Sequence, residues 1–299
     1  ETSKRDFFVI HQSYIQFNRK ESTMNYHSII TVLFTAGLFA QTQVVIEDVM
    51  FMDAPYVGEI TTTTTKYAAD GLFRQEASID VDRFLIRMAM GGNKSVGSIL
   101  NGKTELRFVY NAKDEEYAME TFDAIRENGG NPILKTTMGR MNMGGGSGEG
   151  RENNNSDEEQ EESEYDRTIS ESMERVVGYD ARKVTTKIKS NDGLVLFEEW
   201  FTTDTTLFYF VSKVEVDLVQ SYGGEKRNTP RSFSESMLTS AEQEFESVPG
   251  RMVKYTMEMK DEDDDGFKMV WELKSIREVP FNMADFKIST DYEKVDELE

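Results

Sequence analysis

Apolar and polar residues alternate along most of the chain beyond residue 40, and this alternation is typical of half-buried β-strands. In 251–260 every second side chain is apolar, and the alternation resumes at 267–273 after an acidic turn. These two segments predict a long β-hairpin with one apolar face. The same alternation predicts further strands at 43–52, 57–68, 71–79, 84–90, 106–110, 117–119, 181–189, 193–202 and 206–217.

Helix signals are few. The best segment is 232–247, where Ser232 and Glu235 have the spacing of a capping box and a hydrophobic stripe follows at Met237, Leu238, Ala241 and Phe245. A weaker helix is predicted over 120–128. The pattern therefore predicts a mainly β (α+β) fold, in which one or two helices lie on an antiparallel sheet.

The first 40 residues are interpreted as an upstream segment (1–23) followed by a signal peptide. Residues 28–40 (SIITVLFTAGLFA) are the strongest apolar run and are too short to span a bilayer comfortably. They end in small residues, which predicts cleavage after Ala40 and export to the periplasm or beyond, in a Gram-negative type of cell. An uncleaved membrane anchor is the alternative. Because the chain lacks cysteine, a lipoprotein anchor is excluded.

Composition narrows the chemistry further. The chain has no cysteine, and its two histidines, His11 and His27, both precede Ala40. The predicted mature protein therefore lacks the commonest general base, the thiol nucleophile and the main transition-metal ligands, so we expect neither an enzyme nor a cofactor. A hydrolase that uses a pair of carboxylates is the alternative. With 55 acidic and 34 basic side chains, the net charge of −21 argues against binding to nucleic acid.

A low-complexity segment interrupts the strands at about 139–166. It is rich in glycine and acidic residues and shows no hydrophobic periodicity. Such a composition cannot bury enough apolar surface to offset the entropy of ordering. We predict a disordered acidic insertion within a single domain that spans 41–299. The alternative is an acidic segment that binds a partner or divalent cations.

The turn at 261–266 (DEDDDG), together with Glu272, satisfies the letter pattern of an EF-hand calcium loop. However, an EF-hand requires flanking helices, and both flanks here alternate as strands. We therefore predict a solvated hairpin turn and no metal site.

Three segments carry a family resemblance: 99–120 (ILNGKTELRFVYNAKDEEYAME), 174–186 (ERVVGYDARKVTT) with the strand 197–204 (FEEWFTTD), and Phe286 to Ile288 with Tyr292. The chain resembles the domain-of-unknown-function 4412 family of exported bacterial proteins. This resemblance implies a LolA-like fold, which is an incomplete antiparallel β-barrel wrapped around helices with an apolar concave face. In the LolA and LolB carriers, that face holds lipoprotein acyl chains.

Methionine enrichment fits such a face, because methionine adapts to irregular apolar ligands, although ordinary core packing would explain it too. We predict an exported, non-enzymatic protein that binds a lipid or hydrophobic ligand and does not span the membrane after cleavage. The alternative is an envelope interaction or structural protein that binds a protein partner through its acidic loop. The predicted ligand-binding side chains are Met88, Met90, Tyr255, Met257, Met259, Met269 and Trp271.

Overall fold

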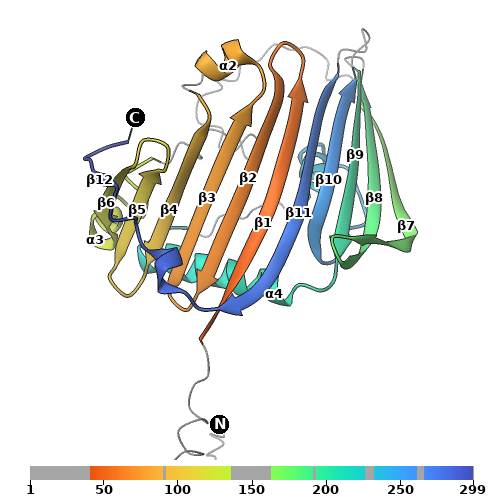
Figure 1. The fold of residues 1–299 in the computed structure, drawn as a ribbon. Coiled ribbons are helices and arrows are strands. Elements are labelled where there is room, and N and C mark those ends of the chain that lie inside the picture. The colour runs from red at the N-terminus through yellow and green to blue at the C-terminus, as the bar shows by residue number, and fades with distance from the viewer. Residues whose placement is uncertain are drawn as a thin grey trace, which may run out of the picture. The chain divides into compact units, whose positions relative to one another are not determined.

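One twelve-stranded sheet dominates the part of the chain that the structure, a computed structural model, describes (Figure 1). That part is residues 41–298 without 90–91, 136–162, 191–192, 226–231 and 261–265. The strands are β1 (Thr42–Ala54), β2 (Gly58–Ala69), β3 (Leu72–Val81), β4 (Lys94–Asn101), β5 (Leu106–Asn111), β6 (Glu116–Thr121), β7 (Glu164–Val176), β8 (Tyr179–Ser190), β9 (Gly193–Thr202), β10 (Arg251–Lys260), β11 (Phe267–Pro280) and β12 (Glu293–Lys294). The helices are α2 (Phe84–Ala89), α3 (Phe122–Glu127), α4 (Thr206–Ser221), α5 (Phe233–Ser240) and the 3-10 helix η2 (Met283–Phe286).

The chain divides into two units, Glu1–Ala40 and Gln41–Glu299. The predicted signal peptide and its cleavage site lie outside the described residues, as do Met90 and most of the acidic insertion. These features therefore stay predictions. The single domain predicted over 41–299 holds all the strands described above.

The strand order across the sheet is β12-β6-β5-β4-β3-β2-β1-β11-β10-β9-β8-β7. All neighbours are antiparallel except β12 and β6. Within the described residues β7 and β12 occupy opposite edges, so the sheet stays open. The mainly β prediction and the incomplete antiparallel barrel are thus confirmed.

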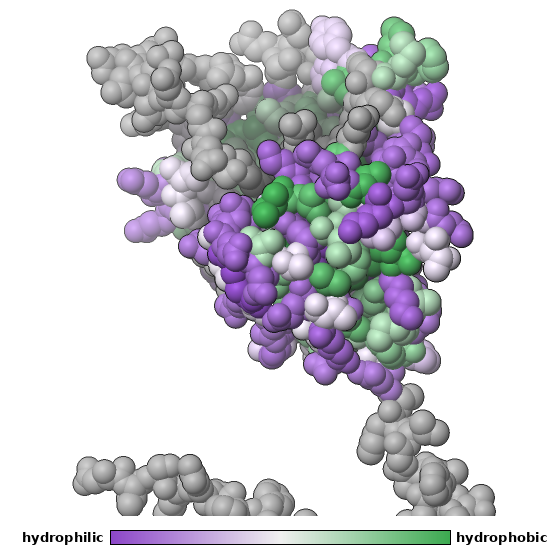
Figure 2. Space-filling view, turned by 90° about the vertical axis from the view of Figure 1, so that its left-hand side faces the viewer, coloured by the Kyte–Doolittle hydropathy of each residue, from purple (hydrophilic) through white to green (hydrophobic). Residues whose placement is uncertain are grey.

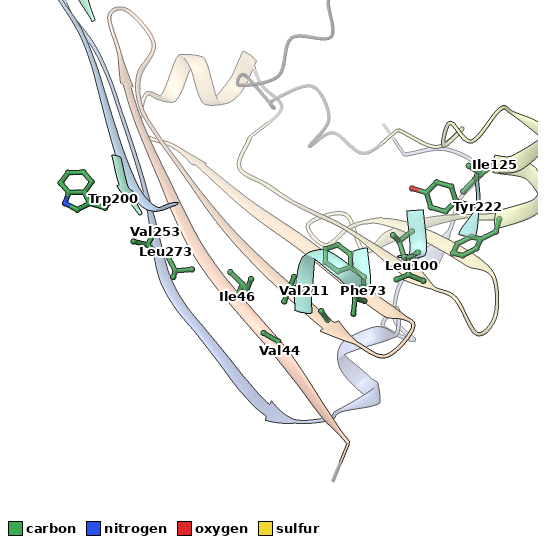
Figure 3. Packing of buried hydrophobic residues seen from close by; sticks show 14 of the residues in the cluster. Val44, Ile46, Phe73, Leu100, Ile125, Trp200, Val211, Tyr222, Val253 and Leu273 are labelled. Carbon is green, nitrogen blue, oxygen red and sulfur yellow. The ribbon is translucent and has the colours of Figure 1, made fainter. Parts of the chain in front are cut away.

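A hydrophobic core fills the concave side of the curved sheet at the end where β1 begins, which is the lower end in Figure 1. Helix α4 crosses this end and buries Val211, Val214 and Leu218. Figure 3 shows Val211 between Ile46 of β1 and Phe73 of β3. Helix α4 therefore packs against β1, β2, β3 and β11 and joins the apolar faces of strands from both ends of the chain.

Helix α4 corrects the prediction of a strand at 206–217. Its sequence is rich in β-branched and aromatic residues, which favour strands locally. However, Val211, Val214 and Leu218 recur at the spacing of one helical face, and burial of that face against the sheet outweighs the local preference.

Two further segments differ from the predictions. Residues 84–89 form helix α2 and not a strand, which is consistent with a composition (FLIRMA) of mostly good helix formers. The acidic insertion was predicted to reach residue 166, but β7 begins at Glu164, where its backbone pairs with Lys189 of β8.

The predicted helices at 232–247 and 120–128 are both present in shorter form. Helix α5 starts at the expected capping box, where the backbone N–H of Glu235 donates to Ser232 Oγ at 3.0 Å. It ends at Ser240, so Phe245 lies beyond it. Helix α3 has a similar cap, with Thr121 Oγ1 accepting from Ala124 N at 3.1 Å.

Truncating a buried leucine of α4 tests the role of this helix in the core. We expect Leu218→Ala to lower the free energy of unfolding by about 2–5 kcal/mol, because it opens a cavity among buried neighbours. Tyr209→Ala on the same helix is the control, since Tyr209 is 66% exposed and its loss should change stability by less than about 0.5 kcal/mol. Urea denaturation followed by circular dichroism measures both, and equal effects would contradict the described packing.

Candidate functional site

A band of methionine and aromatic side chains crosses the concave side of the sheet above the α4 core. Two cross-strand rows build it: Met50, Trp271 and Tyr255 lie opposite one another on β1, β11 and β10, and Met52, Met269 and Met257 form the next row. Met259 follows Met257 on the same face of β10. We call these seven residues the methionine face: Met50, Met52, Tyr255, Met257, Met259, Met269 and Trp271.

The structure brings together five of the seven side chains predicted from the sequence, those on β10 and β11. Met88 lies elsewhere, on α2, where it is 64% exposed. The alternating pattern predicted that Met88 lies on one face of a strand, but the residue belongs to a helix outside the sheet. Met90 is outside the described residues. Met50 and Met52 were missed, although the same alternation in β1 (Val44, Ile46, Asp48, Met50, Met52) would have found them.

The methionine face has a rigid base and an accessible rim. At the base the rings of Tyr255 and Trp271 are stacked, with centroids 6.1 Å apart and planes inclined by 14°. Phe233 of α5 packs on Tyr255 with a centroid distance of 4.7 Å. At the rim Met259 is 44% exposed, and Met257 and Met269 are half-buried. The flexible methionine side chains of the rim therefore lie next to a fixed pair of aromatic rings, Tyr255 and Trp271, which we call the floor of the methionine face.

Asp48 lies beside this floor. Its Oδ1 accepts a hydrogen bond from Trp271 Nε1 at 3.0 Å. Burial raises the pKa of Asp48, while Lys66, Trp271 and Thr64 oppose the shift. The carboxylate thus orients the Trp271 ring from an environment that disfavours its charge.

Glu199 is fully buried at the end of the same cross-strand row, opposite Tyr255. Its carboxylate accepts hydrogen bonds from the hydroxyl groups of Ser232 and Ser234 and, at 2.9 Å, from the backbone N–H of Phe233. It therefore fixes the first turn of α5 to β9 and places Phe233 over Tyr255.

Two of the open hollows on the described surface are lined by residues outside the methionine face. One of about 480 Å³ is lined by Ser78, Arg87, Asn93, Lys94, Ser95 and Lys113. The other, of about 290 Å³, is lined by Ser236, Met237, Ser240 and Ala241 on the side of α5 that faces away from its buried residues. In Figure 2, hydrophobic surface is visible in a recess in the upper part of the molecule.

The described residues contain no group of three or more His, Asp or Glu side chains arranged to hold a metal ion. The acidic turn 261–265 lies outside them. Its flanks are the strands β10 and β11, as predicted, and Glu272 forms an ion pair with Lys274 at 2.5 Å. An EF-hand, which needs two flanking helices, is therefore not formed. None of the described helices is long and apolar enough to cross a membrane.

No protein-family model and no curated protein matches the chain. Among solved structures it is similar to a domain described as an outer membrane lipoprotein-sorting protein from Vibrio parahaemolyticus, with 8% identity, a TM-score of 0.23, and 87% of this chain and 94% of that chain covered. A DUF1329 family protein from Desulfovibrio piger shares 12% identity (TM-score 0.23; 87% and 96% covered). A LolA superfamily protein from Nitrosomonas europaea shares 12% (TM-score 0.22; 86% and 96%).

The raised pKa of Asp48 predicts a pH dependence of stability. The folded chain holds the proton more tightly than the unfolded chain, so the free energy of unfolding falls as pH rises above the ordinary value of 3.8. Asp48→Asn removes the buried charge and keeps an oxygen for Trp271. We expect this variant to be at least as stable as the parent at pH 7, with the difference shrinking as pH falls through 3.8.

Urea unfolding between pH 3 and pH 8 measures this difference. Asp53→Asn on the same strand is the control, since Asp53 is exposed and its substitution should change the free energy of unfolding at pH 7 by less than about 0.5 kcal/mol. A lower stability of Asp48→Asn at pH 7 would contradict the expectation and would show that attraction to Lys66 outweighs burial.

The Glu199 network predicts a local effect on α5. Glu199→Ala leaves two buried serine hydroxyls and a backbone N–H without their acceptor, so we expect a loss of about 1–3 kcal/mol in the free energy of unfolding. Hydrogen exchange in 233–240 should accelerate as well. Glu198→Ala, which removes a partly exposed ion pair with Lys183, is the matched neighbour and should leave α5 protected. Similar hydrogen exchange in the two variants would contradict the role of Glu199 in holding α5 on the sheet.

Proposed function

We propose that this chain is a non-enzymatic binding protein whose methionine face holds a lipid or another hydrophobic ligand. The observation that carries the proposal is the continuous, partly exposed band of five methionines over a stacked Tyr255–Trp271 floor. Methionine side chains are unbranched and polarizable, so they can follow the shape of a flexible alkyl chain. Met52 is buried in a small core with Ile60 and Ile79, but Met259 at the rim is 44% exposed.

The polar groups around the face support binding over catalysis. Asp48 holds the Trp271 ring, and Glu199 holds the first turn of α5. Each carboxylate therefore has a structural role, and a hydrolytic mechanism would require one of them to turn away from its present donors.

Export to the periplasm or beyond belongs to this proposal. It rests on the apolar run at 28–40 and its small terminal residues, and an exported carrier would meet lipids or lipid-modified proteins in the cell envelope. The resemblance to the domain-of-unknown-function 4412 family agrees with such a role.

Placing a charge on the methionine face should abolish binding. We expect Met257→Glu to weaken the affinity for the uncharged dye Nile red at least tenfold, because a carboxylate cannot be desolvated against an alkyl or aromatic ligand without a partner. Fluorescence titration of the purified protein measures it. Met119→Glu is the control, since Met119 is 38% exposed on the opposite face of the sheet and the substitution is the same.

Equal dye affinity in the two variants would show that the ligand does not use the methionine face. Native mass spectrometry of protein purified from its source cell should in addition reveal a bound lipid. A protein that neither carries a lipid nor binds the dye would contradict the proposed function altogether.

A further inference from the structure

The hydroxyl of Tyr255 is an unused hydrogen-bond donor at the floor of the methionine face. The residue is only 3% exposed, yet its hydroxyl makes no hydrogen bond within the described part of the chain. Among those residues, Arg167 Nε is the one fully enclosed side-chain nitrogen or oxygen that lacks a partner. The Tyr255 hydroxyl oxygen must therefore reach a small accessible space, although its ring is packed between Phe233 and Trp271.

The charges next to this hydroxyl are both negative. Glu199 lies directly opposite Tyr255 on β9, and Asp48 accepts from the indole that stacks on the Tyr255 ring. Burial raises the pKa of Tyr255, and the charges of Glu199 and Asp48 raise it further, so the hydroxyl keeps its proton and can donate it. Two cations lie around these carboxylates: Lys66 acts on Asp48, and Arg167 donates to Ser234, which in turn donates to Glu199.

We infer that the ligand is an amphiphile whose head group is uncharged and accepts a hydrogen bond from Tyr255, while its alkyl chain lies along the methionine face. An alcohol, ester or amide oxygen meets this requirement. A carboxylate or phosphate would be brought beside two buried carboxylates, and a quaternary ammonium offers no acceptor to the hydroxyl. This inference rests on the proposed function and adds the class of head group to it.

A set of amphiphiles that share one lauryl chain tests the inference. Monolaurin, laurate and dodecyltrimethylammonium differ in head-group charge, and each can displace Nile red from the full protein at neutral pH and below its micelle concentration. We expect monolaurin to bind at least tenfold more tightly than laurate and more tightly than the ammonium compound. Laurate binding as tightly as monolaurin, or the ammonium compound binding more tightly than both, would overturn the inference.

Removing the hydroxyl alone gives the matched test of Tyr255. Tyr255→Phe keeps the stacked ring, so we expect an unchanged urea midpoint and about a fivefold loss of monolaurin affinity. Tyr209→Phe, at an exposed position of α4, should change neither of these. Unchanged monolaurin affinity in Tyr255→Phe would overturn the inference.

The proposed function and the inferred head group can be disproved separately. If neither Nile red nor any lauryl compound binds the parent protein, the proposed function itself is wrong. If the dye and all three compounds bind with similar affinity, the binding function stands and the inferred head group is wrong.

Discussion

The pairing of β1 with β11 is the constraint on which the rest of the structure depends. It runs from Thr42 opposite Pro280 to Asp53 opposite Lys268 and joins the first strands of the domain to the last. Because side chains alternate between the two sides of a strand, a slip of one residue would move Met50 and Met52 to the convex side. The register is reinforced across the same two strands by the Trp271–Asp48 hydrogen bond and by the Arg277–Glu47 ion pair at 2.9 Å.

A bulge in this pairing lets one sheet hold both a core and an accessible face. Lys274 is the extra residue on β11, so Leu273 and Ile276 both point into the α4 core, while Trp271 and Met269 continue along the same side above it. Helix α4 covers only the end of the sheet where β1 begins, and α5 is held over β9 and β10 by Glu199. The methionine face is the part of the concave side beyond the α4 core, toward the ends of β1 and β10, and α5 borders it at Tyr255.

Alternation was sufficient to predict most strands, since a half-buried sheet imposes a period of two on its sequence. It was insufficient where tertiary contacts decide whether a segment forms a strand or a helix. Residues 206–217 have the β-branched content of a strand and form α4, because only tertiary burial rewards their helical stripe. For the same reason Met88 could be placed on the sheet by pattern but lies on α2. Cross-strand neighbours, such as Met50 beside Trp271, depend on a strand order that local pattern does not encode.

Selectivity between ligands at such a site depends on its floor, Tyr255 and Trp271. Methionine side chains rearrange at little cost, so the rim of the face discriminates poorly between apolar chains of different shape. Tyr255 is different, because its ring is fixed by Phe233 on one side and by the indole that Asp48 orients on the other. The carboxylates that build this floor also set its electrostatics. The buried acids that position the aromatic rings therefore also exclude anionic head groups.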